Sequence, residues 1–227
     1  STWANGLRHI ELAIEMGLNY LDTAASYGNG RGERAFSALI NPSSKRERVF
    51  INTKVSEYDD IRKQRYRTIY DGLTVSEREE VDKVIEKRLS DEQLLREDYT
   101  IPYYDRTRYP QQLRETFLAD EIVKRYPNVS DHRKALLDHI ITSVEESLTR
   151  LQTEYVDIAM CPHAAGSREE MAMPEVREAF YQLKKSGKVR FFGVSAHADP
   201  ATMVKNAAEL GFYDVAMPAF NIVNGKY

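Results

Sequence analysis

Apolar residues recur along this chain with two alternating periods, that of helices and that of strands. Leu7, Ile10 and Ile14 lie three or four positions apart, as on one helix face, and Gly17 stands where such a helix ends. Further helical patterns cover residues 33–39, 130–151, 176–183 and 203–210. Short apolar runs between them predict strands at residues 19–24, 49–55, 156–161, 189–195 and 215–220. Strands that alternate with helices predict an α/β fold with a parallel sheet.

The middle of the chain departs from this alternation. Residues 56–130 contain no strand candidate and are rich in tyrosine, which predicts a helical insertion. Ser76 and Glu79 form a capping-box pattern, and Val81 and Ile85 lie on one face of the helix that it opens. We expect the tyrosines to form the insertion's own core; a substrate cleft and a dimer contact are the alternatives.

Polar residues gather at or just past the carboxyl ends of the predicted strands. A doubly wound sheet and a barrel both satisfy the alternating pattern, but barrel enzymes build their sites from many strand ends. The turn at residues 28–30 has only part of the glycine spacing of a dinucleotide fingerprint, which weakens the doubly wound alternative. The polar residues at the strand ends are Asp22, Lys54, His163, Ser195, His197 and Asn221.

Composition narrows the class of protein. The 227 residues are 42% hydrophobic and 30% charged, which is typical of a globular domain, and no apolar run approaches the ~20 residues of a membrane span. A net charge of -3 favours neither nucleic acid nor an anionic membrane as a partner. Cys161 is the sole cysteine, so no internal disulfide can form. No signal peptide is visible, so the expected compartment is the cytoplasm by default; because the first residue is Ser1 rather than Met, the periplasm is the alternative if an export signal has been removed.

Four of the strand-end and turn residues make a coherent set for reducing a carbonyl group. Negative charge develops on the carbonyl oxygen during reduction, so an acid must donate a proton there. A tyrosine can do this when a nearby ammonium stabilises its phenolate, and a carboxylate can hold that lysine in place. A neutral histidine can orient the substrate oxygen. Asp22, Tyr27, Lys54 and His163 supply these residue types on three successive strand ends.

Four segments carry a resemblance to a known family. Asp22–Gly28 with Glu33 looks like the signature of the aldo-keto reductases, and residues 53–55 look like that family's lysine strand. Residues 146–157 and 188–195 resemble the approach to its histidine strand and the strand that follows. The long interval between Lys54 and His163 resembles a divergent bacterial branch of the family.

The resemblance implies a fold and an activity. The fold is a TIM-type (β/α)8 barrel that is incomplete in this chain, with about strands 2 to 6 present, so that residues 1–227 form a partial barrel interrupted by the insertion at 56–130. The activity is transfer of a hydride between NADP(H), with NAD(H) as the alternative, and a carbonyl or alcohol group. The implied partner is a small, polar, sugar-like molecule; the oligomeric state is not readable from the sequence.

The resemblance also implies individual roles. Tyr27 is the expected general acid and base, Asp22 and Lys54 are its tuning pair, and His163 orients the substrate. Ser195 is expected to touch the nicotinamide carboxamide, and Met217 aligns with a family glutamine that contacts the same group. Ala196 stands where the family has an asparagine. His197 and Asn221 are the candidate substrate-binding residues, although His197 could equally bond a backbone carbonyl.

Two other classes of function remain open at this point. In a metal-dependent barrel hydrolase or isomerase, Asp22, His163 and His197 would ligate a divalent ion. In a non-catalytic binding protein of the same fold, Ala196 and Met217 would mark an altered cofactor site. His132 and His139 lie seven positions apart on the apolar stripe of one predicted helix, which favours core packing over metal binding.

Overall fold

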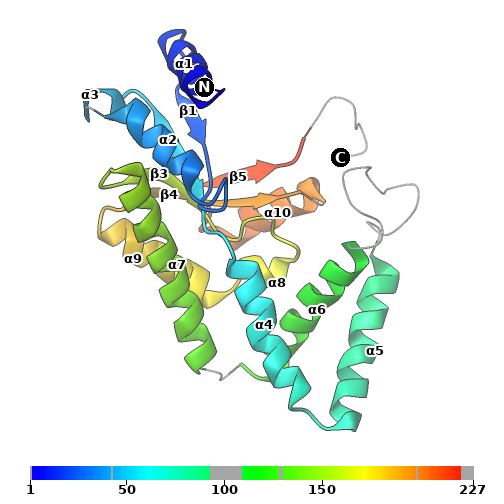
Figure 1. Cartoon of the computed structure of the whole chain (residues 1–227). Helices are drawn as coiled ribbons and strands as arrows, with labels where there is room; N and C mark the ends of the chain where they lie inside the picture. The colour runs from blue at the N-terminus through cyan, green and yellow to red at the C-terminus, as the bar shows by residue number, and fades with distance from the viewer. Residues whose placement is uncertain (1, 42, 93–108, 128–129, 198, 221–227) are drawn as a thin grey trace.

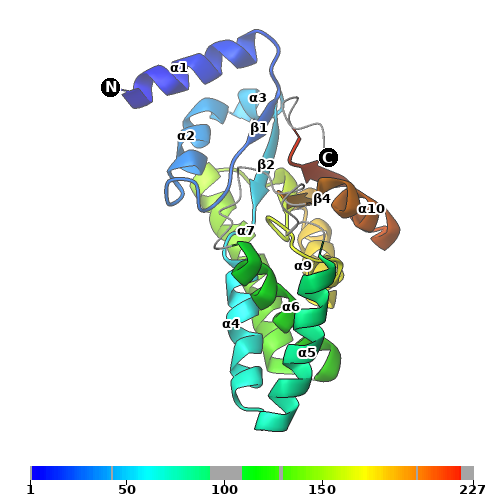
Figure 2. The same cartoon turned by 90° about the vertical axis from the view of Figure 1, so that its right-hand side faces the viewer.

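The computed structural model describes residues 2–41, 43–92, 109–127, 130–197 and 199–220. Within them, five parallel strands pair in chain order, each with the next, as in a barrel wall. They confirm the five predicted strands and the expected incomplete barrel. Figures 1 and 2 show the strands as one twisted sheet with helices packed along its outer side. Their bounds are β1 Tyr20–Asp22, β2 Phe50–Lys54, β3 Val156–Met160, β4 Val189–Ala196 and β5 Val215–Pro218.

Helices connect the strands in the order that the apolar pattern predicted. In the described part of the chain, none of them is both long enough and apolar enough to cross a membrane. The helices outside the 56–130 segment are α1 Thr2–Glu15, α2 Arg31–Ile40, α3 Ser43–Arg46, α7 Ser130–Leu151, α8 Arg168–Met171, α9 Pro174–Lys185 and α10 Pro200–Leu210.

Helix α7 shows how the pattern becomes packing. Its predicted stripe faces the sheet, and five large apolar members of that stripe are 7% exposed or less. Full burial of one such side chain contributes about 1.5–3 kcal/mol, so the stripe is a main contribution to holding the helix against the rest of the core. The five residues are Leu136, Ile140, Val144, Leu148 and Leu151.

The described part of the 56–130 segment consists of three helices, α4 Tyr58–Asp71, α5 Val75–Asp91 and α6 Tyr109–Arg125. Figures 1 and 2 show them side by side, projecting from one end of the sheet. The capping box at Ser76 was predicted two residues too late. Thr74 is the N-cap, and its side chain and that of Glu77 bond each other's backbone. Both 74–77 and 76–79 match the capping-box pattern, and the turn before α5 selects the earlier one.

These helices share one apolar core with the barrel wall. Tyr58 and Tyr66 of α4 are buried together with Val81 and Ile85 of α5, and all four belong to the same cluster as Ile51 of β2. These two tyrosines are therefore core residues, as predicted, but the core is shared with the barrel wall and is not the insertion's own. Four others (Tyr99, Tyr103, Tyr104 and Tyr109) lie where no side chain is described.

A buried carboxylate ties three strands together at their amino-terminal ends. Asp157 of β3 is 1% exposed, and Oδ2 accepts hydrogen bonds from Arg46 Nη2 at 2.7 Å and from the backbone N–H of Ile51 at 2.9 Å. Oδ1 accepts from Arg190 Nη1 of β4 at 2.8 Å. The amino-terminal end of such a sheet serves stability rather than chemistry. Asp157 is therefore a structural residue.

Replacing Asp157 with alanine will strongly destabilise the protein. The change leaves the buried guanidinium of Arg46 without its carboxylate, and breaking a buried pair in this way costs about 3–5 kcal/mol. Urea unfolding monitored by circular dichroism measures the loss. Glu11→Ala is the control, because it removes an exposed ion pair with Lys45 and should cost less than about 1 kcal/mol. Equal losses in the two variants would show that Asp157 does not anchor the strands.

Candidate active site

The ammonium of Lys54 is a buried, hydrogen-bonded charge at the carboxyl end of the sheet. The side chain ends β2 and is 3% exposed. Nζ donates to Asp22 Oδ1 at 2.6 Å, to Asp22 Oδ2 at 2.7 Å and to the backbone carbonyl of Thr23 at 2.9 Å. Three acceptors match the three hydrogens of an ammonium. The structure thus brings Asp22 and Lys54 together as the sequence predicted, and fixes the lysine charge in one position.

Asn52 is a member of this group that sequence reasoning missed. It lies two residues before Lys54 on β2, so both side chains point to the same face of the sheet. Its Nδ2 donates to Asp22 Oδ1 at 2.5 Å, and the side chain is fully buried. The period of two along the strand was the available signal, because it places a second polar group beside the lysine.

Tyr27 lies on the turn after β1, beside the lysine. Its ring centroid is 4.9 Å from Lys54 Nζ, and its side chain is exposed at the mouth of the sheet. The turn passes through left-handed backbone at Gly28 (φ 59°) and Gly30 (φ 77°), a conformation that glycine adopts without steric cost. The backbone N–H of Ser26 donates to Ser56 Oγ at 3.0 Å, which ties this turn to the segment after β2.

A second buried carboxylate holds the helix that follows the tyrosine turn. Glu33 of α2 is 0% exposed, and it accepts hydrogen bonds from Thr53 Oγ1 at 2.6 Å and from Arg150 Nε at 2.5 Å. Thr53 precedes Lys54 on β2, and Arg150 belongs to α7. The clamp therefore links the helix after Tyr27 to the strand that carries the lysine, and fixes their relative position.

His163 and His197 lie together at the ends of β3 and β4. Their ring centroids are 6.5 Å apart, and both rings are tilted rather than stacked. Burial lowers the pKa of His163 to about 4, and the positive charge of Lys54 and the protonated form of His197 act in the same direction. Burial, and then Lys54, lower the pKa of His197 as well. Both rings are therefore neutral at pH 7.

The remaining predicted site residues are placed by β4 and β5. Ser195 is 5% exposed, and its Oγ accepts a hydrogen bond from the backbone N–H of Ala164 at 3.3 Å, immediately after His163. Met217 is its register partner on β5 and is half-buried. Asn221 lies outside the described residues. The structure thus brings six of the predicted residues to the carboxyl end of the sheet and places Met217 on the edge strand β5. The six are Asp22, Tyr27, Lys54, His163, Ser195 and His197.

The geometry gives no support to a metal centre. Among the described residues, no group of three or more histidine, cysteine, aspartate or glutamate side chains is arranged to hold a metal ion. Both oxygens of Asp22 are already engaged by Lys54. His139 packs as predicted for a structural histidine, with Nε2 2.9 Å from the backbone oxygen of Ser56. His132 packs against the ring of Tyr66.

Comparison with known proteins gives the relatives of this chain. It is 37% identical over 106 residues to the uncharacterized oxidoreductase YcsN of Bacillus subtilis (strain 168), a match that covers 42% of this chain and 34% of that protein. It is 33% identical over 81 residues to L-galactose dehydrogenase of Arabidopsis thaliana, covering 35% of this chain and 25% of that protein. The matched segments thus span about a third or less of these relatives.

A solved structure supports the fold. The thermostable aldo-keto reductase Tm1743, crystallised with the inhibitor epalrestat, superposes with a TM-score of 0.54 at 18% identity, over 99% of this chain and 53% of that one. The chain therefore spans about half of a known barrel of this type. A family model described as the aldo/keto reductase family matches residues 4–99 and 105–223. With nearly the whole chain matched and the lysine–aspartate pair in place, this protein belongs to the aldo/keto reductase family.

Proposed function

We propose that this protein reduces a carbonyl group with a nicotinamide cofactor, and that Asp22, Tyr27, Lys54 and His163 carry the reaction. One observation supports this most directly: the Lys54 charge is held by Asp22, 4.9 Å from the ring of Tyr27. An ammonium in that position stabilises the phenolate that forms when the tyrosine gives up its proton. The cofactor, when bound, supplies a hydride to the carbonyl carbon.

The proton takes a separate route. As the carbonyl carbon gains the hydride, electrons of the C=O bond move to oxygen, and Tyr27 donates its hydroxyl proton there. The products are an alcohol and a tyrosine phenolate next to Lys54. Because Tyr27 is 44% exposed, solvent can return a proton to it before the next turnover. Oxidation of an alcohol uses the same atoms in the reverse order.

His163 is proposed to orient the substrate oxygen. A neutral imidazole donates one hydrogen bond without releasing a proton, which is what a positioning group for a developing oxyanion requires. The lowered pKa of about 4 keeps the ring in that form, because Lys54 and burial both disfavour the imidazolium. His197 is proposed to contact the substrate from the neighbouring strand end, 6.5 Å away between ring centroids.

The residues at the ends of β4 and β5 fit a nicotinamide carboxamide in part. Ser195 Oγ already accepts a hydrogen bond from Ala164, and its hydroxyl hydrogen has no acceptor among the described residues, so it can donate to an amide oxygen. Met217, beside it on β5, offers an apolar thioether in place of a second amide. We therefore propose that Ser195 holds the carboxamide and that Met217 makes only a packing contact.

The identity of cofactor and substrate is proposed at the level of chemical class. Aldo-keto reductases in general use NAD(P)H, and we propose NADPH here with NADH as the alternative. The name of the matched L-galactose dehydrogenase supports a small polyhydroxylated carbonyl compound as substrate. We propose that Asn221 also contributes to binding this substrate. We further propose that the protein acts in the cytoplasm.

Replacing Tyr27 with phenylalanine will strongly reduce turnover without abolishing cofactor binding. Loss of a general acid costs roughly 100-fold to 10,000-fold in rate, while the exposed ring itself is kept. The measurement is NADPH oxidation with a simple aldehyde, together with a fluorescence titration of NADPH. Tyr181→Phe is the matched control, since it removes an exposed hydroxyl from the outer helix α9. Normal turnover in the Tyr27 variant would remove the tyrosine from the mechanism, and binding of neither nucleotide to the wild type would overturn the proposal.

The pKa of His163 gives a prediction about pH. A group whose pKa is lowered on folding favours the folded state above its unfolded value, and this contribution is lost as the pH falls from about 6.5 to about 4. We expect the His163 ring to stay neutral down to about pH 5 in NMR titration. In Lys54→Met, the repelling charge is gone and Asp22 remains, so the pKa should rise. A midpoint near 6.5 in both proteins would contradict the proposed environment.

A further inference from the structure

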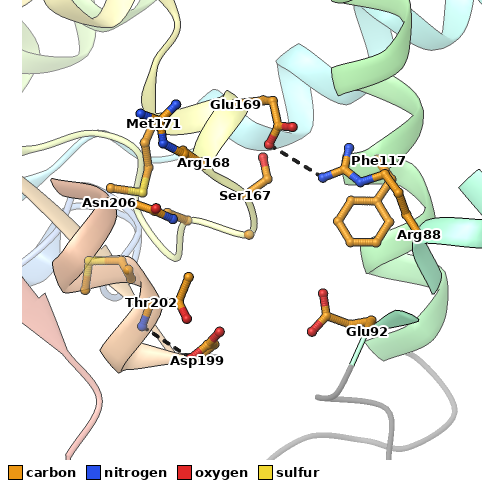
Figure 3. A pocket seen from close by; sticks show the side chains of 13 residues that line it. Arg88, Glu92, Phe117, Ser167, Arg168, Glu169, Met171, Asp199, Thr202 and Asn206 are labelled. Atoms are coloured by element: carbon orange, nitrogen blue, oxygen red, sulfur yellow. Dashed lines mark hydrogen bonds and ion pairs between the residues drawn. The ribbon is translucent and has the colours of Figure 1, made fainter. Parts of the chain in front are cut away.

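A polar pocket of about 230 Å³ lies between the 56–130 helices and the barrel, outside the site already described. Figure 3 shows it from close by: Arg88, Glu92 and Phe117 form the wall on the side of α5 and α6, and residues of α8 and α10 form the opposite wall. The remaining lining residues are Ala165, Gly166, Ser167, Arg168, Glu169, Met171, Asp199, Thr202, Met203 and Asn206.

The pocket adjoins the loops that carry the two active-site histidines. Two of its lining residues lie close to these histidines in sequence: Ala165 follows His163 by two residues, and Asp199 follows His197 by two residues. The carboxyl ends of parallel strands meet at one end of a barrel, so the pocket lies at the same end as Tyr27 and Lys54. The pocket therefore lies on the side of the strand ends where the loops after β3 and β4 carry His163 and His197.

Buried charges fix the pocket walls in place. Asp120 of α6, whose side chain is 1% exposed, accepts hydrogen bonds from Arg62 Nη2 of α4 at 2.5 Å and from Arg88 Nη1 of α5 at 3.2 Å. It also accepts from Ser167 Oγ at 3.2 Å, which anchors the loop after His163 to the inserted helices. Removal of such a network is costly, so the loop after His163 is held firmly against the inserted helices.

The arginines of the pocket are already committed to partners. Arg88 lies 3.9 Å from the centroid of the Phe117 ring and pairs with Glu169 at 3.5 Å as well as with Asp120. Arg168 pairs with Glu209 at 3.7 Å. Each arginine of the pocket therefore has a carboxylate beside it, and Glu92 and Asp199 add two further negative charges, so the lining does not favour an anionic ligand.

The groups that face the cavity suit hydroxyl-bearing ligands. Figure 3 shows the Glu92 carboxylate turned toward Asp199 and Thr202 across the cavity. Carboxylates accept hydrogen bonds from hydroxyl groups, and the Asn206 amide, which makes no hydrogen bond among the described residues, can both donate and accept. A polyol carries a hydroxyl group on each successive carbon, and each hydroxyl can both donate and accept a hydrogen bond. Such a ligand can therefore bond to the carboxylates and to the amide of this pocket.

We propose that this pocket is a subsite for the hydroxylated end of the substrate, with Asp199 and Asn206 as its recognition residues. The inference rests on the proposed reductase activity and adds a specificity site built by the inserted helices. It predicts that hydroxyl groups distant from the reacting carbonyl lower KM, whereas an apolar aldehyde gains nothing from the pocket.

The test compares D-xylose with butanal as substrates of the purified protein. Asn206→Ala should raise KM for D-xylose roughly tenfold, the effect of losing a hydrogen bond to a ligand hydroxyl, and Asp199→Asn should raise it less, because asparagine keeps one acceptor oxygen; both should leave kcat/KM for butanal unchanged. Asp199→Asn keeps an N-cap for α10, which limits its effect on folding. Lys205→Ala, one position away on α10 and exposed, is the matched control and should change neither substrate.

A binding measurement separates the two proposals. Saturation-transfer NMR with xylitol, which cannot be reduced, should show contact in the wild type and weaker contact in Asn206→Ala. If the wild type reduces neither aldehyde, the proposed activity fails, while xylitol binding lost in Asn206→Ala would still support the subsite. If the wild type reduces both aldehydes, and the Asn206 and Asp199 variants have the same KM for D-xylose as the wild type, the proposed subsite is contradicted. Equal loss with butanal and D-xylose would also contradict it, since that result indicates a general structural role.

Discussion

The arrangement of the site depends on how the chain accommodates one buried ammonium. A charge at the 3% exposure of Lys54 is costly unless it is paired and fully hydrogen-bonded. Asp22 and the carbonyl of Thr23 meet this requirement with all three hydrogens engaged. Both acceptors lie at the end of β1, so the lysine fixes the start of the turn that carries Tyr27. Together with burial, which has the larger effect, the same charge lowers the pKa of His163 at the end of β3.

Two buried carboxylates hold the sheet together, one at the end that serves stability and one beside the candidate site. Asp157 joins β2, β3 and β4 near their amino termini, where its partners are arginines and backbone. Glu33 joins the helix after Tyr27 to β2 and α7 beside the site. The loops at the carboxyl ends can therefore carry polar and half-exposed residues, because the strands beneath them are fixed by buried interactions.

The sequence predicted the strands, their order and the clustering of Asp22, Lys54 and His163, because these follow from local apolar periods and a short, ordered set of motifs. It did not predict the contact of Asn52 with Asp22, which requires the pairing register of β1 and β2. It also missed the Arg62–Asp120 pair, whose members lie 58 residues apart and meet only through helix packing. The capping box at Thr74 was misplaced because two overlapping patterns fit the same turn.

The central claim is that a hydride passes from a nicotinamide to a carbonyl carbon at this strand end. The most direct measurement supplies NADPH with deuterium at the transferable position of its nicotinamide, adds an aldehyde, and analyses the alcohol by mass spectrometry. The account predicts that the alcohol gains one deuterium on the former carbonyl carbon. An alcohol without deuterium, or no alcohol at all from protein that binds the nucleotide, would contradict it.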